Sequence, residues 1–208
     1  MKIEIIDDFL PEQRCIELDY ILSRGPSKWD FKYHSDFGSY YLYFLVVSNG
    51  YHDNDFKFYF EPLFERLGIQ LSQVWKLECH LYPGFTRRFH HESCSNYPVD
   101  YDLKTCLYFP HTTNAPTVFS LRDPTKLLRD KFPREKTKSI ECKRNRALIF
   151  DGSIYHHSTS PTDSNYRTSV NLDWVEDITR LTEVPIYKIT GGYNNPDYPI
   201  KNPPEGGF

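Results

Sequence analysis

Two pairs of adjacent histidines are the residues of this sequence best suited to metal chemistry. His90 and His91 are followed at once by Glu92, and His156 and His157 stand together much later in the chain. Residues two apart in an extended strand point to the same side, so His90 and Glu92 can bind one ion together while His91 points the other way. His156 can supply a third ligand from a distant strand. Two histidines and one carboxylate leave positions open for a cosubstrate and O2, and these ligands suit Fe(II).

Arg167 and Ser169 form a second candidate group, suited to binding an anion beside such a metal. They lie two residues apart in the alternating stretch 166–174, so they share one face of a predicted strand. A guanidinium can hold a carboxylate through two charge-assisted hydrogen bonds, and no acidic residue in this stretch is an evident fixed partner. We therefore expect a diacid ligand that binds the metal at one end and Arg167 at the other.

Each of these features also has an ordinary structural explanation. An isolated His-x-Glu sequence is common, a strand arginine usually forms a surface ion pair, and adjacent histidines often lie in solvated loops. The order and spacing of all three features on predicted strands favour one shared site over three unrelated features.

The secondary structure that must position these residues is predicted to change from mainly helical to β near residue 74. The earlier part predicts a short strand at 3–6 and two helices, at about 11–24 and 53–67, with Pro62 kinking or restarting the second. The later part alternates with a period of two and predicts strands at 75–82, 103–109, 116–121, 146–150 and 166–174. About eight main strands in residues 74 to 174 would form a β-sandwich or barrel, with the two helices packed on one sheet.

Length and composition predict one globular domain. The chain has 208 residues, of which 39% are hydrophobic and 25% charged, as in a folded protein rather than a disordered one. We divide it into an N-terminal support at 1–73, a β core at 74–174 and an extended tail at 175–208. The longest apolar run, at 40–47, is too short to span a bilayer, and the N-terminus lacks the apolar stretch of a signal peptide. We therefore expect a cytoplasmic protein.

Charge and cysteine content argue against two further classes. A net charge of −3 is not that of a protein that binds nucleic acid over its whole surface. The five cysteines lack a CxxC spacing, so neither a disulfide framework nor a thiolate zinc site is indicated. The segment 122–146 holds ten Lys and Arg against four Asp and Glu. We interpret it as a solvated insertion between two strands; the alternative is a basic lip that steers an anionic substrate.

The sequence resembles the 2-oxoglutarate and Fe(II)-dependent oxygenases, specifically the compact prolyl-hydroxylase-like group that includes phage members. The resemblance covers most of the chain. Its segments are Ile5-Ile6-Asp7-Asp8-Phe9-Leu10-Pro11-Glu12, Tyr82-Pro83-Gly84 leading into His90-His91-Glu92, the strand 103–109, Asn145 to His156, and Tyr166-Arg167-Thr168-Ser169. The stretch from Asn145 to His156 is the strongest match.

This resemblance implies a mostly β fold, the double-stranded β-helix, a cupin-like jelly roll with N-terminal helices packed on one sheet. It also implies a hydroxylase of the dioxygenase type, an oxidoreductase that consumes O2 and 2-oxoglutarate at Fe(II), oxidises a C–H bond and releases succinate and CO2. The substrate would be a small molecule or a peptide, and the sequence does not indicate which.

The resemblance also assigns roles to individual residues. They are His90, Glu92 and His156 as iron ligands, Arg167 with Ser169 at the distal carboxylate of 2-oxoglutarate, and Tyr82 or Tyr108 as further cosubstrate contacts. The spacing from Phe150 favours His156 over His157 as the second histidine ligand.

Three departures from the family pattern accompany the resemblance. Glu92 stands where an aspartate is more usual, Pro110 and His111 stand where many relatives have an asparagine, and 114–117 lacks a glycine often found there. A carboxylate at position 92 argues against a halogenase. Two alternatives stay open: a catalytically inactive jelly-roll binding protein, and a cupin-like metalloenzyme that does not use 2-oxoglutarate. Arg167 with Ser169 favours the oxygenase over the second alternative.

Overall fold

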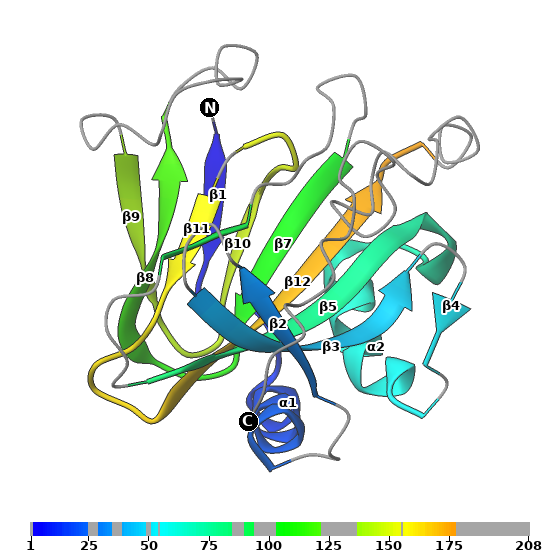
Figure 1. Ribbon diagram of the computed structural model, residues 1–208. Helices are drawn as coiled ribbons and strands as arrows, with labels where there is room; N and C mark the ends of the chain where they lie inside the picture. Colours follow the sequence, from blue (N-terminus) through cyan, green and yellow to red (C-terminus); the bar gives the residue numbers. More distant parts are fainter. Residues whose placement is uncertain are drawn as a thin grey trace, which may run out of the picture.

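Two antiparallel sheets facing each other form the body of the protein (Figure 1). The computed structural model describes residues 2–24, 29–34, 39–48, 51–53, 55–84, 90–93, 103–121, 137–154 and 156–177, without the side chains of 32–34, 39–40, 48, 51–52 and 90–93. Most of the predicted tail, from 178 onward, and the basic segment 122–136 lie outside the described residues.

In the described part of the chain the larger sheet has eight strands and the smaller one four. The larger sheet has the order β1 (Ile3–Ile6), β10 (Arg146–Asp151), β7 (Leu103–Phe109), β12 (Tyr166–Val175), β5 (Val74–Pro83), β3 (Ser39–Ser48) and β2 (Asp30–His34), with β4 (Tyr51–His52) paired to β3. The smaller sheet has the order β6 (His90–Ser93), β11 (His156–Thr159), β8 (Thr113–Ser120) and β9 (Thr137–Cys142). From β5 to β12 the chain changes sheet at every step except β8 to β9, which is the arrangement of a double-stranded β-helix.

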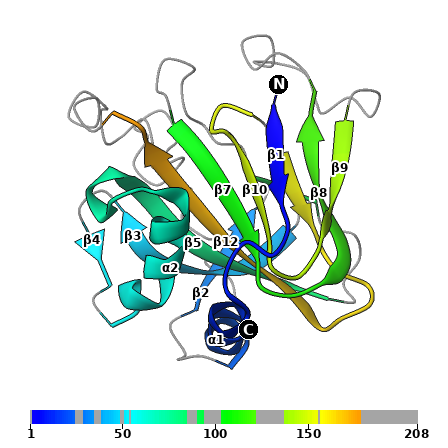
Figure 2. The same ribbon diagram turned by 180° about the vertical axis from the view of Figure 1, so that it is seen from behind.

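Two helices, α1 (Glu12–Arg24) and α2 (Lys57–Leu67), cover the face of the larger sheet that is turned away from the smaller one (Figure 2). Both bury apolar residues that recur at helical spacing, namely Cys15, Leu18 and Leu22 in α1 and Phe60, Leu63 and Phe64 in α2. Helix α2 ends at Gly68, whose φ of 69° is left-handed. It begins at Lys57, later than predicted, and runs through Pro62 without a restart. A short 3₁₀ helix, η1 (Leu71–Gln73), then leads into β5.

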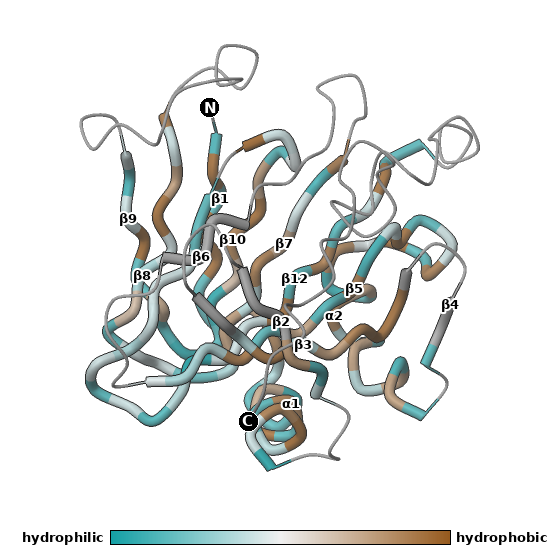
Figure 3. Tube along the Cα trace, viewed as in Figure 1, coloured by the Kyte–Doolittle hydropathy of each residue, from teal (hydrophilic) through white to brown (hydrophobic). Residues whose placement is uncertain are grey.

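The larger sheet is buried on both faces. On the helix side, Leu77, Cys79, Val170 and Leu172 belong to the core that α1 and α2 complete. A second core lies between the sheets and contains Leu107, Phe109, Phe119, Ile140, Leu148, Phe150 and Ile154. Hydrophobic and hydrophilic residues are interspersed along the central strands β5, β7 and β12 (Figure 3). Polar residues therefore occur on strands that both cores cover.

Most of the predicted architecture is confirmed. The fold is mostly β, eight strands (β5 to β12) lie between residues 74 and 175, and two helices pack on one sheet. The apolar run at 40–47 is the middle of β3, and β9 occupies part of the segment predicted as an insertion. The division of the chain at 73 and 174 stays a prediction. None of the described helices is long and apolar enough to cross a membrane.

Candidate functional site

One face of the central strand pair β5–β12 carries polar side chains although nearly all of them are buried. Antiparallel pairing places Tyr82 opposite Arg167, His80 opposite Ser169, Glu78 opposite Asn171 and Lys76 opposite Asp173. Residues in opposite positions share a face of the sheet, and we call these eight residues the polar face. The residues between them pack towards the helices, so the polar face is turned towards the smaller sheet.

Arg167 bridges the two sheets. Its side chain is completely buried, with 0% of its surface exposed. Nη1 donates to the carbonyl oxygens of Pro116 and Thr159, both at 3.3 Å, and Nη2 donates to Thr117 Oγ1 at 2.6 Å. Because these partners belong to β8 and β11 of the smaller sheet, the guanidinium lies between the sheets.

No carboxylate balances the charge of Arg167 within the residues that the structure describes. None of their acidic side chains forms an ion pair with it, its Nε has no hydrogen-bond acceptor among them, and the nearby Ser169 Oγ is also buried without a partner there. Burying a guanidinium is costly unless an anion and hydrogen bonds compensate. A ligand carboxylate is the simplest group that would supply both.

Tyr82 lies beside Arg167, as its position in the register requires. The centre of its ring is 5.7 Å from the guanidinium carbon, and its hydroxyl is 3.2 Å from His80 Nδ1. Burial raises the pKa of Tyr82 to about 12, although a hydrogen bond from Ser158 and the charge of Arg167 oppose the shift. Tyr82 is therefore a neutral phenol that can donate or accept a hydrogen bond next to the guanidinium.

Tyr108 does not join this site, which corrects the expectation that it could reach the cosubstrate. It pairs with Val170 on β12, and Val170 faces the helices. Its ring lies 6.2 Å from the ring of Phe9, and its hydroxyl donates to Asn145 Oδ1 at 3.1 Å. Tyr108 thus packs on the opposite face of the larger sheet from Arg167.

Gly84 allows β5 to end against the turn that precedes Arg167. Its N–H donates to the carbonyl oxygen of Asn165 at 2.7 Å. A Cβ at this position would come within 1.8 Å of the carbonyl oxygen of Ser164. The sequence Tyr82-Pro83-Gly84 therefore brings two backbones closer together than any larger residue would permit.

Glu78 is a buried carboxylate held between two basic side chains of the polar face. Lys76 Nζ lies 2.8 Å from Glu78 Oε2, and His80 Nε2 lies 3.3 Å from the same oxygen without being aligned for a hydrogen bond. Burial alone would raise the pKa of Glu78, but Lys76 and His80 together lower it well below its usual range. Glu78 is therefore ionised, and it places a negative charge in the space between the sheets.

Of the three predicted metal ligands, His156 has a side chain that the structure describes, whereas those of His90 and Glu92 lie outside the described part. It is buried between the sheets, with its ring 5.7 Å from Phe119 and 4.9 Å from Phe150. Its Nδ1 lies 3.0 Å from the carbonyl oxygen of Ile154; because a carbonyl only accepts, Nδ1 carries the hydrogen and Nε2 the lone pair. Burial lowers the pKa of His156 to about 4, so the ring is neutral. A neutral imidazole oriented by a backbone carbonyl is the usual state of a metal-binding histidine.

The backbone of β6 brings the other two predicted ligands onto the strand next to His156. Pairing places Ser93 opposite His156, Glu92 opposite His157 and His90 opposite Thr159. In this register His90 and Glu92 share the sheet face of His157, not that of His156. No group of three or more His, Cys, Asp and Glu able to hold an ion occurs among the described side chains, which do not include those of His90 and Glu92.

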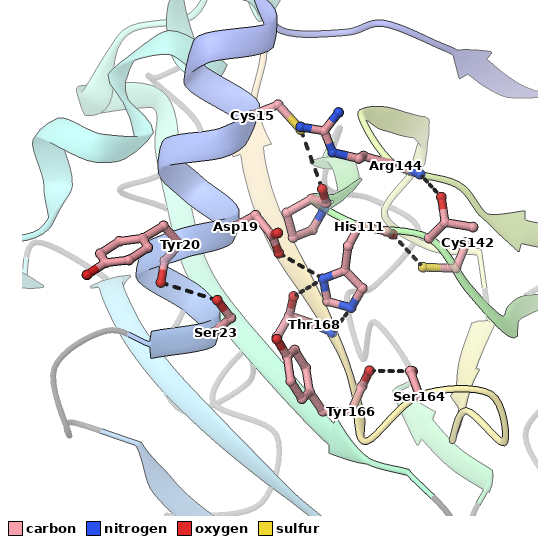
Figure 4. A network of polar contacts seen from close by, with 12 residues as sticks. Cys15, Asp19, Tyr20, Ser23, His111, Cys142, Arg144, Ser164, Tyr166 and Thr168 are labelled. Atoms are coloured by element: carbon pink, nitrogen blue, oxygen red, sulfur yellow. Dashed lines mark hydrogen bonds and ion pairs between the residues drawn. The ribbon is translucent and has the colours of Figure 1, made fainter.

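His111 supports the strand of the anion site from the opposite side (Figure 4). The backbone N–H of Thr168, the residue between Arg167 and Ser169, donates to His111 Nε2 at 3.3 Å. His111 Nδ1 therefore carries the hydrogen, and it lies 3.0 Å from Asp19 Oδ1 on α1. Through His111, strand β12 is thus connected to helix α1 at Thr168, the residue next to Arg167.

Sequence reasoning missed Glu78, His80 and His111. A usable signal for the first two was present, because polar residues at every second position of 76–82 alternate with apolar ones, as on a strand with one polar face. Both faces of the larger sheet are covered, so the polar residues Glu78 and His80 are buried, and buried polar groups need partners. His111 gave no such signal, since its partners come from residues distant in the sequence.

Comparisons with known proteins agree with this fold. No family model matches the sequence, and no curated protein matches it. Among solved structures, a prolyl hydroxylase from Trichoplax adhaerens in complex with a hypoxia-inducible factor peptide superposes with a TM-score of 0.58 at 14% identity, covering 88% of this chain and 87% of that one. The α-ketoglutarate-dependent carbocyclase SnoK of nogalamycin biosynthesis gives 0.59 at 8% identity, covering 88% and 86%.

HygX from Streptomyces hygroscopicus, solved with nickel and 2-oxoglutarate bound, gives a TM-score of 0.54 at 8% identity and covers 83% of this chain and 82% of that one. The protein is thus a jelly-roll protein of the double-stranded β-helix type. More particularly, it has the fold of the 2-oxoglutarate and Fe(II)-dependent oxygenases, as the resemblance of its sequence implied.

Proposed function

We propose that this protein is a 2-oxoglutarate- and Fe(II)-dependent dioxygenase that hydroxylates a small-molecule or peptide substrate and releases succinate and CO2. The observation that carries the proposal is Arg167, a fully buried guanidinium between the sheets that no described carboxylate balances. The fold is compatible with this activity, because structures of the same fold include a non-heme α-ketoglutarate-dependent carbocyclase and a protein solved with nickel and 2-oxoglutarate bound.

In this proposal Arg167 binds the distal carboxylate of 2-oxoglutarate. A charged hydrogen-bonding partner would offset the desolvation of the guanidinium and give its Nε an acceptor. Ser169, one residue pair further along the same face, offers a hydroxyl that lacks a partner among the described residues. Tyr82, which pairs with Arg167 from the neighbouring strand β5, offers a phenol. Together they would orient a diacid along the polar face.

The proposed iron ligands are His90, Glu92 and His156. The tautomer of His156 fits this role, because its Nε2 holds a lone pair and its ring is neutral. When bound, Fe(II) supplies the redox chemistry of the reaction. The residues of the chain hold and orient the reactants, and the apolar rings of Phe119 and Phe150 shield His156 from water.

The ligand set requires β6 to present His90 and Glu92 on the face of His156. A shift of one residue in the pairing of two strands exchanges their faces. Strand β6 has four residues and lies at the edge of the smaller sheet, paired with β11. We propose that metal binding selects the pairing in which His90 and Glu92 face His156. Iron binding by variants of His90 and His91 distinguishes this pairing from the one in the present structure, because only one of the two histidines shares the face of His156 in each pairing.

Binding of 2-oxoglutarate to the iron-loaded protein under anaerobic conditions tests the cosubstrate. We expect saturable binding that succinate and other carboxylates displace. A protein that binds iron but not 2-oxoglutarate would instead be the cupin-like metalloenzyme, and one that binds neither would be a jelly-roll binding protein.

A further inference from the structure

Residues of the smaller sheet and of β7 fix the orientation of the Arg167 guanidinium. Nη1 donates to the carbonyl oxygens of Pro116 and Thr159, and Nη2 donates to Thr117 Oγ1 at 2.6 Å. The ring of Phe109 lies 5.2 Å from the guanidinium carbon, close enough to attract the cation. Thr117 is completely buried, with 0% of its surface exposed. Its contact with Arg167 is therefore shielded from water.

These contacts leave two N–H donors of Arg167 for a ligand. An arginine side chain has five N–H donors, and the two carbonyl oxygens and the Thr117 hydroxyl occupy three of them. The other two are the N–H of Nε and the second hydrogen of Nη2, neither of which has an acceptor among the described residues.

The two remaining donors lie on one edge of the guanidinium. Pro116 and Thr117 are consecutive residues of β8 and accept from the two terminal nitrogens, so they occupy the edge that Nη1 and Nη2 form. The edge formed by Nε and Nη2 is left open. Two parallel N–H groups on one edge match the two oxygens of a carboxylate.

The open edge is also the one closer to β12, because Nε is the guanidinium nitrogen nearest to the backbone of Arg167. Ser169 lies on the same face of β12, and its buried hydroxyl has no partner among the described residues. A carboxylate bound side-on at Nε and Nη2 would therefore approach the second buried group that needs a partner.

We propose that Thr117 is a positioning residue of the cosubstrate site, which holds Nη2 so that the Nε–Nη2 edge of Arg167 receives the distal carboxylate. The inference rests on the proposed function, because the carboxylate is that of 2-oxoglutarate. Its further content is the edge of Arg167 that binds and the role of a residue from the smaller sheet. Without the hydroxyl of Thr117, a hydrogen of Nη2 loses its acceptor and the guanidinium loses one of the contacts that orient it.

Anaerobic calorimetry of 2-oxoglutarate binding to the iron-loaded protein tests this role. Thr117→Val removes the hydroxyl but keeps the branched shape of the side chain, whereas Thr117→Ser keeps the hydroxyl. We expect Thr117→Val to weaken binding roughly three- to tenfold, the effect of one hydrogen bond, and Thr117→Ser to stay within about twofold of the wild type. If Thr117→Val does not fold, Thr117→Ala also removes the hydroxyl and should show the same loss.

A double-mutant cycle with Arg167→Lys separates positioning of the guanidinium from a general structural effect. Lysine has no Nη2 for Thr117 to hold, so Thr117→Val should weaken binding by less than about twofold in the Arg167→Lys protein. The matched control is Thr113→Val, the same change in the same strand, because the Thr113 hydroxyl accepts from the N–H of Ala115 instead of from Arg167. This control should bind 2-oxoglutarate as the wild type does.

Three results would overturn the role of Thr117 and leave the proposed function intact. They are wild-type affinity in Thr117→Val, an equal loss in Thr117→Ser and Thr117→Val, and the same loss from Thr117→Val with arginine or lysine at position 167. Failure of the wild-type protein to bind 2-oxoglutarate at all would instead contradict the proposed function, so the two failures are distinguishable.

Discussion

Arg167 is the residue on which the proposed cosubstrate site depends most. Its guanidinium is held by three acceptors of the smaller sheet, and its position between the sheets is therefore fixed before any ligand arrives. A lysine would keep the positive charge at this position but would lose the planar, two-pronged donor group. Comparing arginine with lysine at position 167 therefore shows whether the site needs the two-pronged donor group or only a positive charge.

We expect Arg167→Lys to weaken 2-oxoglutarate binding by about tenfold or more, because one charge-assisted hydrogen bond contributes about 1.5–3 kcal/mol. Iron binding should not change. Anaerobic calorimetry on the iron-loaded proteins measures the cosubstrate affinity, and metal analysis measures the bound iron. The matched control is Arg146→Lys, since Arg146 pairs with Asp7 away from the site, and it should bind the cosubstrate as the wild type does. Equal affinities of Arg167→Lys and wild type would rule out the assignment.

His156 and His157 differ in their environment, which leads to a test of the metal site. His156 lies between Phe119 and Phe150 of the core between the sheets. We expect His156→Gln and His90→Ala to abolish stoichiometric iron binding, measured by metal analysis, while His157→Gln and His91→Ala retain it. Loss of iron in the His91 variant, with retention in the His90 variant, would mean that the pairing of β6 seen here also holds with metal bound. Loss in the His157 variant would refute the ligand role of His156.

Among the elements, the turn between β9 and β10 holds the N-terminal segment onto the larger sheet. Asn145, with a φ of 57°, lies in this turn. Its side chain accepts from the N–H of Leu10 and from Tyr108 Oη and donates to the carbonyl oxygen of Leu10. The left-handed backbone and the local hydrogen bonds explain why asparagine suits this position.

We expect Asn145→Ala to lower the free energy of unfolding by roughly 3 kcal/mol, because the buried groups of Leu10 and Tyr108 lose their partners and alanine resists a positive φ. Asn145→Gly should be less destabilising by roughly 1 kcal/mol, since glycine accepts the backbone conformation. Urea unfolding of the metal-free proteins measures both values. A change in Asn145→Ala that is within the error of the wild-type value would show that these hydrogen bonds contribute little.

Regular alternation of residue types made several strands predictable, whereas β3 and β9 were missed for two different reasons. The stretch 75–82 alternates between apolar and polar residues, so both its strand character and its polar face could be predicted. The run 40–47 is apolar on both sides, which is typical of a buried strand but equally of a buried helix, and β3 was missed. β9 was missed because its exposed residues are charged and polar, and the surrounding charges favoured an insertion.

The candidate site was predictable in its residue types but not in its three-dimensional detail. Arg167, Ser169 and Tyr82 lie on one buried face, which alternation along two strands indicated. Tyr108 was placed wrongly because β7 is buried on both faces, so periodicity does not tell which face belongs to the site. The support of β12 by His111 depends on contacts between distant segments, which no local pattern encodes.

For the whole molecule, the buried His156 makes stability depend on pH. Its pKa falls from 6.5 to about 4 on folding because burial disfavours the charged ring. The unfolded chain therefore binds more protons between these two values, so this contribution to stability is present above about pH 6.5 and is lost as the pH falls towards 4. Carboxylates with lowered pKa values, such as Asp7, lose their contributions only at lower pH.

We expect the metal-free protein to lose roughly 3 kcal/mol of unfolding free energy from this group between about pH 6.5 and 4. Urea unfolding across this pH range measures the loss. His156→Leu, which cannot be protonated, should show a flatter pH dependence over the same interval. An identical dependence in both proteins would mean that His156 is not buried in the neutral state.

The central claim, that this jelly-roll protein is an oxygenase, is tested most directly by conversion of 2-oxoglutarate to succinate. The measurement follows succinate formed by anaerobically purified, iron-loaded protein after O2 is admitted, with the Arg167→Lys and His156→Gln variants alongside. We predict that succinate forms only when iron, O2 and 2-oxoglutarate are all present, and that both variants are strongly impaired. Absence of succinate from wild-type protein that has bound iron and 2-oxoglutarate, or equal rates in all three proteins, would contradict the account.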